Sequence, residues 1–111
     1  MTTNHATGHK AEKGAASYLQ TIGYRIIELN WKTKYCEIDI VAEKNKTVYF
    51  VEVKYRKSAA QGDGFDYITP KKLKAMKFAA QMWLANHSWE GECSLAAVSA
   101  SPYDYEITEV I

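Results

Sequence analysis

The chain has 111 residues, a hydrophobic fraction of 47% and a net charge of +1. This length suits one compact domain, and this hydrophobic content is too high for an intrinsically disordered chain. A net charge this close to zero gives no reason to expect that the molecule as a whole attracts nucleic acid, so any basic surface that binds it has to be local.

The first predicted element is a helix over residues 8–22, where apolar side chains recur at helical spacing. Gly23 follows it and favours a helix end there, because glycine readily adopts a left-handed backbone conformation. Three strands are then predicted, at residues 25–31, 37–43 and 47–55.

A second helix is predicted after a polar loop at residues 57–68. Thr69 is suited to cap the N-terminus of this helix, and Pro70 to occupy its first position. The helix is expected to extend to about Asn86.

Two further strands are predicted at residues 94–100 and 105–111. The resulting order, α-β-β-β-α-β-β, indicates a mixed α/β fold in which helices pack on a sheet that contains a hairpin. Since nothing in the sequence divides the chain, we expect one domain over residues 1–111.

The hairpin between the second and third strands has a definite register. If residues 45–46 form a two-residue turn, Asp39 lies opposite Glu52, and Glu37 lies opposite Lys54 and would hold it in place. Because side chains alternate along a strand, these four polar residues share one face of the sheet. The other face then receives core side chains, which are Ile38, Ile40, Val51 and Val53.

The opposition of two acids indicates a metal site. Directly opposed side chains have Cβ atoms about 4.5–5.5 Å apart, and like charges there are destabilising. The electrostatic repulsion between Asp39 and Glu52 is small only if one of them takes up a proton or a cation lies between them. Mg²⁺ commonly binds one or two carboxylates, with water or phosphate in its remaining positions. Lys54, on the same face, is placed to hold an attacking water or the charge of a scissile phosphate.

The alternative is a pair of strands with one solvated face, which is the usual meaning of alternating charged and apolar residues. Glu37 and Lys54 would then form a surface ion pair worth about 0–1 kcal/mol. This alternative leaves the opposition of Asp39 and Glu52 unexplained, and it places the apolar side chain of Phe50 on a solvent-exposed surface.

Residues 37–41 (Glu-Ile-Asp-Ile-Val) and 48–56 (Val-Tyr-Phe-Val-Glu-Val-Lys-Tyr-Arg) resemble the signature of the YraN-like family of predicted endonucleases. The likeness begins at residues 8–12 and extends to Lys71 and Lys72, so it covers most of the chain. The family is similar to archaeal Holliday-junction resolvases and belongs with the PD-(D/E)XK nucleases, which have a restriction-endonuclease-like fold. The resemblance implies an endonuclease that depends on Mg²⁺ or Mn²⁺ and cuts branched or otherwise structured DNA.

The same resemblance implies roles for individual residues. Asp39 and Glu52 would be the metal-binding acids, with the backbone carbonyl of Val53 as a third protein ligand. Lys54 would be the catalytic lysine. Glu12, on the first helix, matches the acid that helps to complete the metal site in related resolvases.

A basic segment adjoins these acids. Residues 44–77 hold nine Lys or Arg and three Asp or Glu, an excess of six positive charges. Within it, the resemblance makes Arg56 a phosphate contact, and Lys71, Lys72 and Lys74 occupy the start of the second helix. For each single lysine a solvated helix face is the alternative, but as a group they indicate contact with DNA.

The remaining features indicate the cellular compartment and limit the possible partners. Cys36 and Cys93 lie far apart and match no metal-ligand spacing, which favours reduced thiols. Residues 1–10 are polar and do not form a signal peptide, and no apolar run approaches the roughly 20 residues that span a bilayer. We therefore expect a cytoplasmic protein with no membrane partner.

The sequence thus predicts a metal-dependent nuclease with Glu12, Asp39, Glu52 and Lys54 as its catalytic residues. Cutting both DNA strands symmetrically requires two active sites, which makes a homodimer compatible with this function. Two alternatives remain open, a non-catalytic nucleic-acid-binding module of the same fold and a small structural domain whose charged face is solvated.

Overall fold

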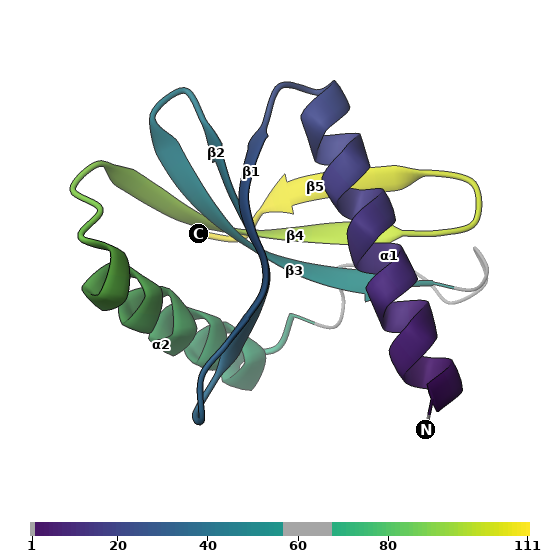
Figure 1. Cartoon of the computed structure of the whole chain (residues 1–111), viewed down its shortest axis with the longest axis horizontal. Helices are drawn as coiled ribbons and strands as arrows, with labels where there is room; N and C mark the ends of the chain where they lie inside the picture. Colours follow the sequence, from purple (N-terminus) through teal and green to yellow (C-terminus); the bar gives the residue numbers. More distant parts are fainter. Residues whose placement is uncertain (1, 57–67) are drawn as a thin grey trace.

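The computed structural model describes residues 2–56 and 68–111, with side chains from residue 11 onward (Figure 1). Its two helices are α1 (Thr2–Thr21) and α2 (Pro70–His87). The strands are, in chain order, β1 (Arg25–Lys32), β2 (Glu37–Lys44), β3 (Thr47–Tyr55), β4 (Glu92–Ala100) and β5 (Tyr105–Glu109). The predicted order α-β-β-β-α-β-β and the mixed α/β class are confirmed.

The five strands form one sheet in the order β1-β2-β3-β4-β5. Strands β3 and β4 are parallel, whereas the other three pairs are antiparallel. A parallel pair cannot be joined by a tight turn, so the chain crosses from β3 to β4 through α2. This crossover brings the start of α2 near the end of β3.

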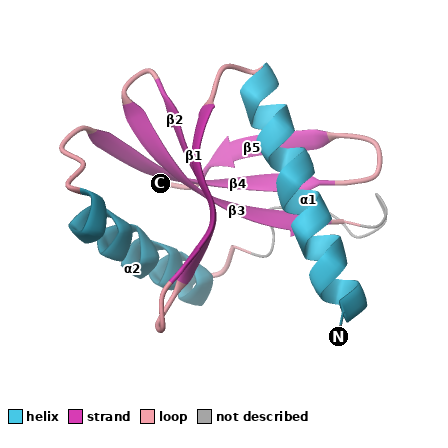
Figure 2. Cartoon of the chain, in the orientation of Figure 1, coloured by secondary structure: helices cyan, strands magenta, loops and turns pink. Residues whose placement is uncertain are grey.

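The two helices cover opposite faces of the sheet (Figure 2). Beneath α1, Ala15 and Leu19 pack against Ile40 and Val51. Beneath α2, a second cluster contains Met76, Trp83, Val41, Val48 and Phe50. Phe50 and Val51 are neighbours on β3 and enter different clusters, as alternation along a strand requires.

Short sequence signals fix the connections. Gly23 has φ +99°, and the backbone N–H of Tyr24 donates to the carbonyl of Leu19 at 2.9 Å, which ends α1. Asn45 and Lys46 both have positive φ, 53° and 66°, as a two-residue primed hairpin turn requires.

Several predicted boundaries differ from those of the structure. Helix α1 begins at Thr2 rather than at residue 8, and β4 begins at Glu92 rather than at residue 94. The predicted loop at residues 57–68 lies outside the described residues except for its last position. Neither described helix is long and apolar enough to cross a membrane.

Gly14 gives a test of how closely α1 packs on the sheet. A Cβ atom added at this position would collide with the hydroxyl oxygen of Tyr105, whose ring is stacked on Tyr18 with centroids 5.4 Å apart. Alanine normally stabilises a helix by about 1 kcal/mol relative to glycine. Here we expect Gly14→Ala to lower the free energy of unfolding by about 1–3 kcal/mol, because the stacked ring must shift.

Urea denaturation of Gly14→Ala checks this expectation. The same substitution is also made in a Tyr105→Phe chain, which lacks the hydroxyl oxygen nearest to the added Cβ atom. There, Gly14→Ala should lower the free energy of unfolding by less than it does in the parent chain. A Gly14→Ala chain more stable than the parent would show that α1 sits further from β5 than described.

Candidate active site

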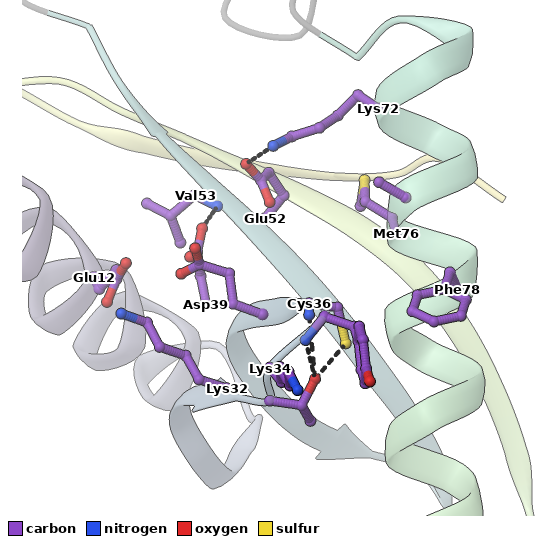
Figure 3. A pocket seen from close by; sticks show the side chains of 14 residues that line it. Glu12, Lys32, Lys34, Cys36, Asp39, Glu52, Val53, Lys72, Met76 and Phe78 are labelled. Carbon is purple, nitrogen blue, oxygen red and sulfur yellow. Dashed lines mark hydrogen bonds and ion pairs between the residues drawn. The ribbon is translucent and has the colours of Figure 1, made fainter.

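The site lies where the sheet divides. The ladder between β2 and β3 runs from Lys44–Thr47 to Ile40–Val51 and ends there. Beyond that point β2 stays paired with β1 as far as Glu37, while β3 stays paired with β4 as far as Tyr55. A cavity of about 620 Å³ opens at this fork, lined by α1, the β1–β2 turn, β2, β3 and α2 (Figure 3).

Asp39 is held at the point of the fork. Its Oδ2 accepts the backbone N–H of Val53 at 2.8 Å, so a side chain of β2 bonds the backbone of β3 where the ladder has ended. Burial raises the pKa of Asp39 to about 7, a change that the Val53 hydrogen bond opposes and the nearby Glu12 reinforces. A carboxyl group with such a pKa holds a proton readily, and a bound cation would displace that proton.

A change of face accompanies Asp39. Ile38 packs in the cluster beneath α2, whereas Ile40, two residues along β2, packs beneath α1. The prediction that Ile38 shares a core face with Ile40, Val51 and Val53 is therefore wrong. On the neighbouring β1, Asn30 has φ 52°, a left-handed conformation that interrupts regular strand geometry at the same level.

Glu12 reaches this position from α1, as Figure 3 shows. Burial raises its pKa, while hydrogen bonding to the side chains of Asp39 and Asn30 acts in the opposite direction. Its Oε1 is buried and has no hydrogen-bond partner among the described residues. A buried carboxylate oxygen without a partner is costly, so this atom is suited to a ligand that supplies positive charge or a proton.

Glu52 enters the cavity from β3 and meets Lys72 of α2. Lys72 Nζ lies 2.9 Å from Glu52 Oε2. Burial and the charge of Asp39 raise the pKa of Glu52, whereas the hydrogen bond and charge of Lys72 lower it. Burial lowers the pKa of Lys72, but Glu52 and Asp39 outweigh this effect, so the net change in the pKa of Lys72 is upward.

The position of Lys72 follows from the start of α2. Thr69 caps the helix, because its Oγ1 accepts the backbone N–H of Lys72 at 3.1 Å. Pro70 occupies the first turn, as predicted. The first turn thus projects Lys72 toward β3, and sequence spacing alone gave no sign of this contact.

The structure brings most of the predicted site residues together. Glu12, Glu37, Asp39, Glu52, Val53 and Lys72 all line the same cavity. Lys54 is exposed and lies in an adjoining hollow, which Glu52, Lys71 and Lys72 also line.

Several predicted placements differ. Because the β2–β3 ladder ends at Ile40–Val51, it contains neither the expected opposition of Asp39 and Glu52 nor that of Glu37 and Lys54. Glu37 pairs with Lys32 of β1 instead. Arg56 does not line the cavity, and its Nε donates to the buried Ser99 Oγ at 2.8 Å. Lys71 and Lys74 are exposed on α2.

The donors of the cavity fit a hard cation in part. Four carboxylates, those of Glu12, Glu37, Asp39 and Glu52, line the cavity and supply oxygen atoms. Glu12 Oε1, which has no hydrogen-bond partner among the described residues, is the strongest sign of an unmet positive partner. Within residues 11–56 and 68–111, no three His, Cys, Asp or Glu side chains are close enough to form a ready-made metal site. A cation would therefore take one or two of these acids directly and fill its other positions with water or substrate.

Residues 11–103 match the uncharacterised protein family UPF0102. The chain belongs to this family. A UPF0102 protein of Vibrio vulnificus (strain YJ016) is 38% identical over 94 residues, which cover 85% of the chain and 76% of that relative. A UPF0102 protein of Chlorobium phaeobacteroides (strain DSM 266) is 44% identical over 80 residues, which cover 72% of the chain and 63% of that relative.

A third UPF0102 relative comes from Bradyrhizobium diazoefficiens. It is 43% identical over 89 residues, which cover 80% of the chain and 65% of the relative. The predicted YraN-like membership is thereby confirmed as membership of UPF0102. The segment matched to UPF0102 contains Glu12, Asp39, Glu52 and Lys72.

The pKa of Asp39 makes stability depend on pH. Because this pKa is about 7 in the folded chain and 3.8 as its ordinary value, the folded chain binds more protons between these limits. The free energy of unfolding should therefore fall as pH rises from about 4 to about 7. Asp39→Asn keeps an acceptor for the Val53 N–H and removes the charge, so we expect it to stabilise the chain at pH 8 by up to a few kcal/mol.

Urea denaturation in EDTA at pH 5 and pH 8 measures this difference. The advantage of Asp39→Asn should shrink at pH 5, where Asp39 is protonated. Glu90→Gln, at an exposed position after α2, is the control and should leave the parent's pH dependence in place. An Asp39→Asn chain less stable than the parent at pH 8 would contradict the assignment.

Proposed function

We propose that this chain is an endonuclease dependent on Mg²⁺ or Mn²⁺ that hydrolyses phosphodiester bonds in branched or otherwise structured DNA. The observation that carries the proposal is the gathering of Glu12, Asp39 and Glu52 in one cavity beside Lys72. Each of these carboxyl groups has a raised pKa, so each is held at a cost that a cation would relieve.

The chemistry assigns distinct tasks to these residues. Asp39, Glu52 and the backbone carbonyl of Val53 would hold the cation, and Glu12 would accept a hydrogen bond from water at its edge. A cation bound there would polarise the phosphate and lower the pKa of water. Lys72 restrains Glu52 and offers positive charge to the phosphate within the same cavity.

Lys54 lines the adjoining hollow together with Glu52 and Lys72. An exposed ammonium group at this place is suited to contact a phosphate next to the scissile one. Lys71 and Lys74 extend the positive surface along α2, so the backbone of the substrate would pass from the cavity over the start of this helix.

The YraN-like resemblance supports the same reading and adds the restriction-endonuclease-like, PD-(D/E)XK affiliation to the proposal. The mixed sheet flanked by two helices is compatible with it. A non-catalytic nucleic-acid-binding module is the alternative, and it gives no reason to bury three acids together, since carboxylates repel a phosphate.

Cleavage of labelled four-way-junction, flap and linear DNA tests the proposal. With Mg²⁺ or Mn²⁺ we expect cutting that EDTA abolishes, and Glu52→Gln should lower the rate at least about 100-fold. Glu43→Gln is the matched control, because Glu43 lies in the same hairpin, forms an ion pair with Arg25 and does not line the cavity.

Binding of these substrates without cutting, under every metal condition, would favour the non-catalytic module. Equal rates for Glu52→Gln and Glu43→Gln would place the cutting elsewhere on the chain.

The pairing of Lys72 with Glu52 predicts a change in the pH profile. Since Lys72 lowers the pKa of Glu52, Lys72→Met should raise that pKa. Metal binding requires the ionised carboxylate, so the acidic limb of kcat/KM should move to higher pH. Lys77→Met, also on α2 and exposed, should leave both the limb and the maximum unchanged. An unmoved limb in Lys72→Met would show that Glu52 does not control it.

A further inference from the structure

Two exposed aromatic side chains stand at the mouth of the cavity. Tyr35 is 70% exposed and Phe78 is 46% exposed, and both line the same hollow as Asp39 and Glu52. One comes from the β1–β2 turn and the other from α2, so they approach the acids from two different elements. A single exposed aromatic residue is ordinary, but two beside one acidic cavity call for a ligand.

The turn that carries Tyr35 is fixed by its own hydrogen bonds. Thr33 Oγ1 accepts the backbone N–H of Tyr35 at 3.0 Å and that of Cys36 at 3.1 Å, and the backbone N–H of Thr33 donates to the carbonyl of Cys36 at 2.8 Å. Lys34 Nζ lies 5.9 Å from the centroid of the Tyr35 ring. An exposed ring and a cation are thus held together at the tip of the turn.

Phe78 continues a basic row on α2. Lys71, Lys74 and Phe78 are all exposed and follow one another at positions i, i+3 and i+7, which share one side of a helix. Figure 3 shows Phe78 and Met76 on α2 across from Cys36 and Lys34 of the turn. One exposed side of α2 therefore carries two lysines and an aromatic ring, and the ring lines the cavity that holds the acids.

This arrangement discriminates between possible ligands. A protein partner would favour a contiguous apolar surface, whereas here the two rings share the lining of the cavity with charged side chains, among them Lys32, Lys34 and Lys72. Proteins that bind single strands combine a positively charged groove for the backbone with aromatic rings on which bases stack. In a duplex, the bases are already stacked on each other and do not offer their faces to Tyr35 or Phe78.

We propose that Tyr35 and Phe78 are stacking platforms for unpaired nucleotides, and that the substrate carries a single-stranded segment at the cavity. The volume of about 620 Å³ is that of a pocket for a nucleotide-sized group. Bases stack on the two rings, and Lys34, Lys71 and Lys74 contact the phosphates. The cutting of the bound strand rests on the proposed function, whereas the binding of the strand does not.

Equilibrium binding in EDTA separates the binding from the cutting. The probes are fluorescein-labelled oligothymidylate, oligouridylate and a blunt DNA duplex of equal length, measured by anisotropy at a stated salt concentration. We expect the parent chain to prefer the single strands to the duplex. Phe78→Leu keeps an apolar side chain and removes the aromatic face, so it should weaken single-strand binding by roughly 5- to 100-fold.

Phe78→Tyr is the conservative variant and should retain binding. Tyr35→Leu should act as Phe78→Leu does, and Tyr35→Phe should retain binding. Tyr103→Leu is the matched control, because Tyr103 is 91% exposed in the β4–β5 connection and does not line the cavity. The two single-stranded probes show whether DNA or RNA binds more tightly.

Phe78→Leu that binds oligothymidylate and oligouridylate as tightly as Phe78→Tyr would overturn the inference. An equal loss for the duplex and the single strands would also overturn it, because the rings would then not act on unpaired bases. Selective loss of single-strand binding supports it even if no metal produces cutting, in which case the proposed hydrolysis fails and the binding site stands.

Discussion

The hydrogen bond from the Val53 N–H to Asp39 Oδ2 is the contact on which the architecture of the site depends. A β-ladder normally satisfies its own backbone groups, and here one carboxylate takes over that task where β2 and β3 part. The parting lets β2 follow β1 and β3 follow β4, which opens a cavity inside a continuous sheet. The same bond keeps an acid at a buried position that would otherwise favour an apolar side chain.

The charges of the cavity form one connected system. Burial raises the pKa of Glu12, Asp39 and Glu52, and each acid adds to the effect on at least one other. Among the described residues, Lys72 opposes this effect at Glu52, with which it forms an ion pair from the side of α2. On the side of α1, the buried Glu12 Oε1 has no hydrogen-bond partner in the described part of the chain, so an added positive ion would stabilise that side.

Local patterns predicted the parts of the fold that local chemistry decides. The two-residue turn at Asn45 and Lys46 predicted the hairpin register as far as Ile40–Val51. Thr69 and Pro70 marked the start of α2. The end of the ladder after Ile40–Val51 was not predictable, because it depends on β1 and β4 holding their partners, and no pattern within the hairpin encodes it.

The contact of Lys72 with Glu52 was not predictable for the same reason. Spacing along β3 pointed to Lys54, since it follows Glu52 by two residues. Lys72 is distant in sequence and reaches Glu52 only because Met76 and Trp83 dock α2 on Phe50. The left-handed conformation of Asn30 was not predicted either.

The parallel pairing of β3 with β4 also fixes when the site can exist during folding. The hairpin with Asp39 and Glu52 is local and can form early, but Lys72 lies on the crossover between β3 and β4 and is positioned only when that non-local pair closes. A nascent chain that has not yet added β4 therefore carries both hairpin acids without their lysine. Assembly of the cavity is thus tied to the closure of a non-local strand pair, so a partly folded molecule lacks a finished site.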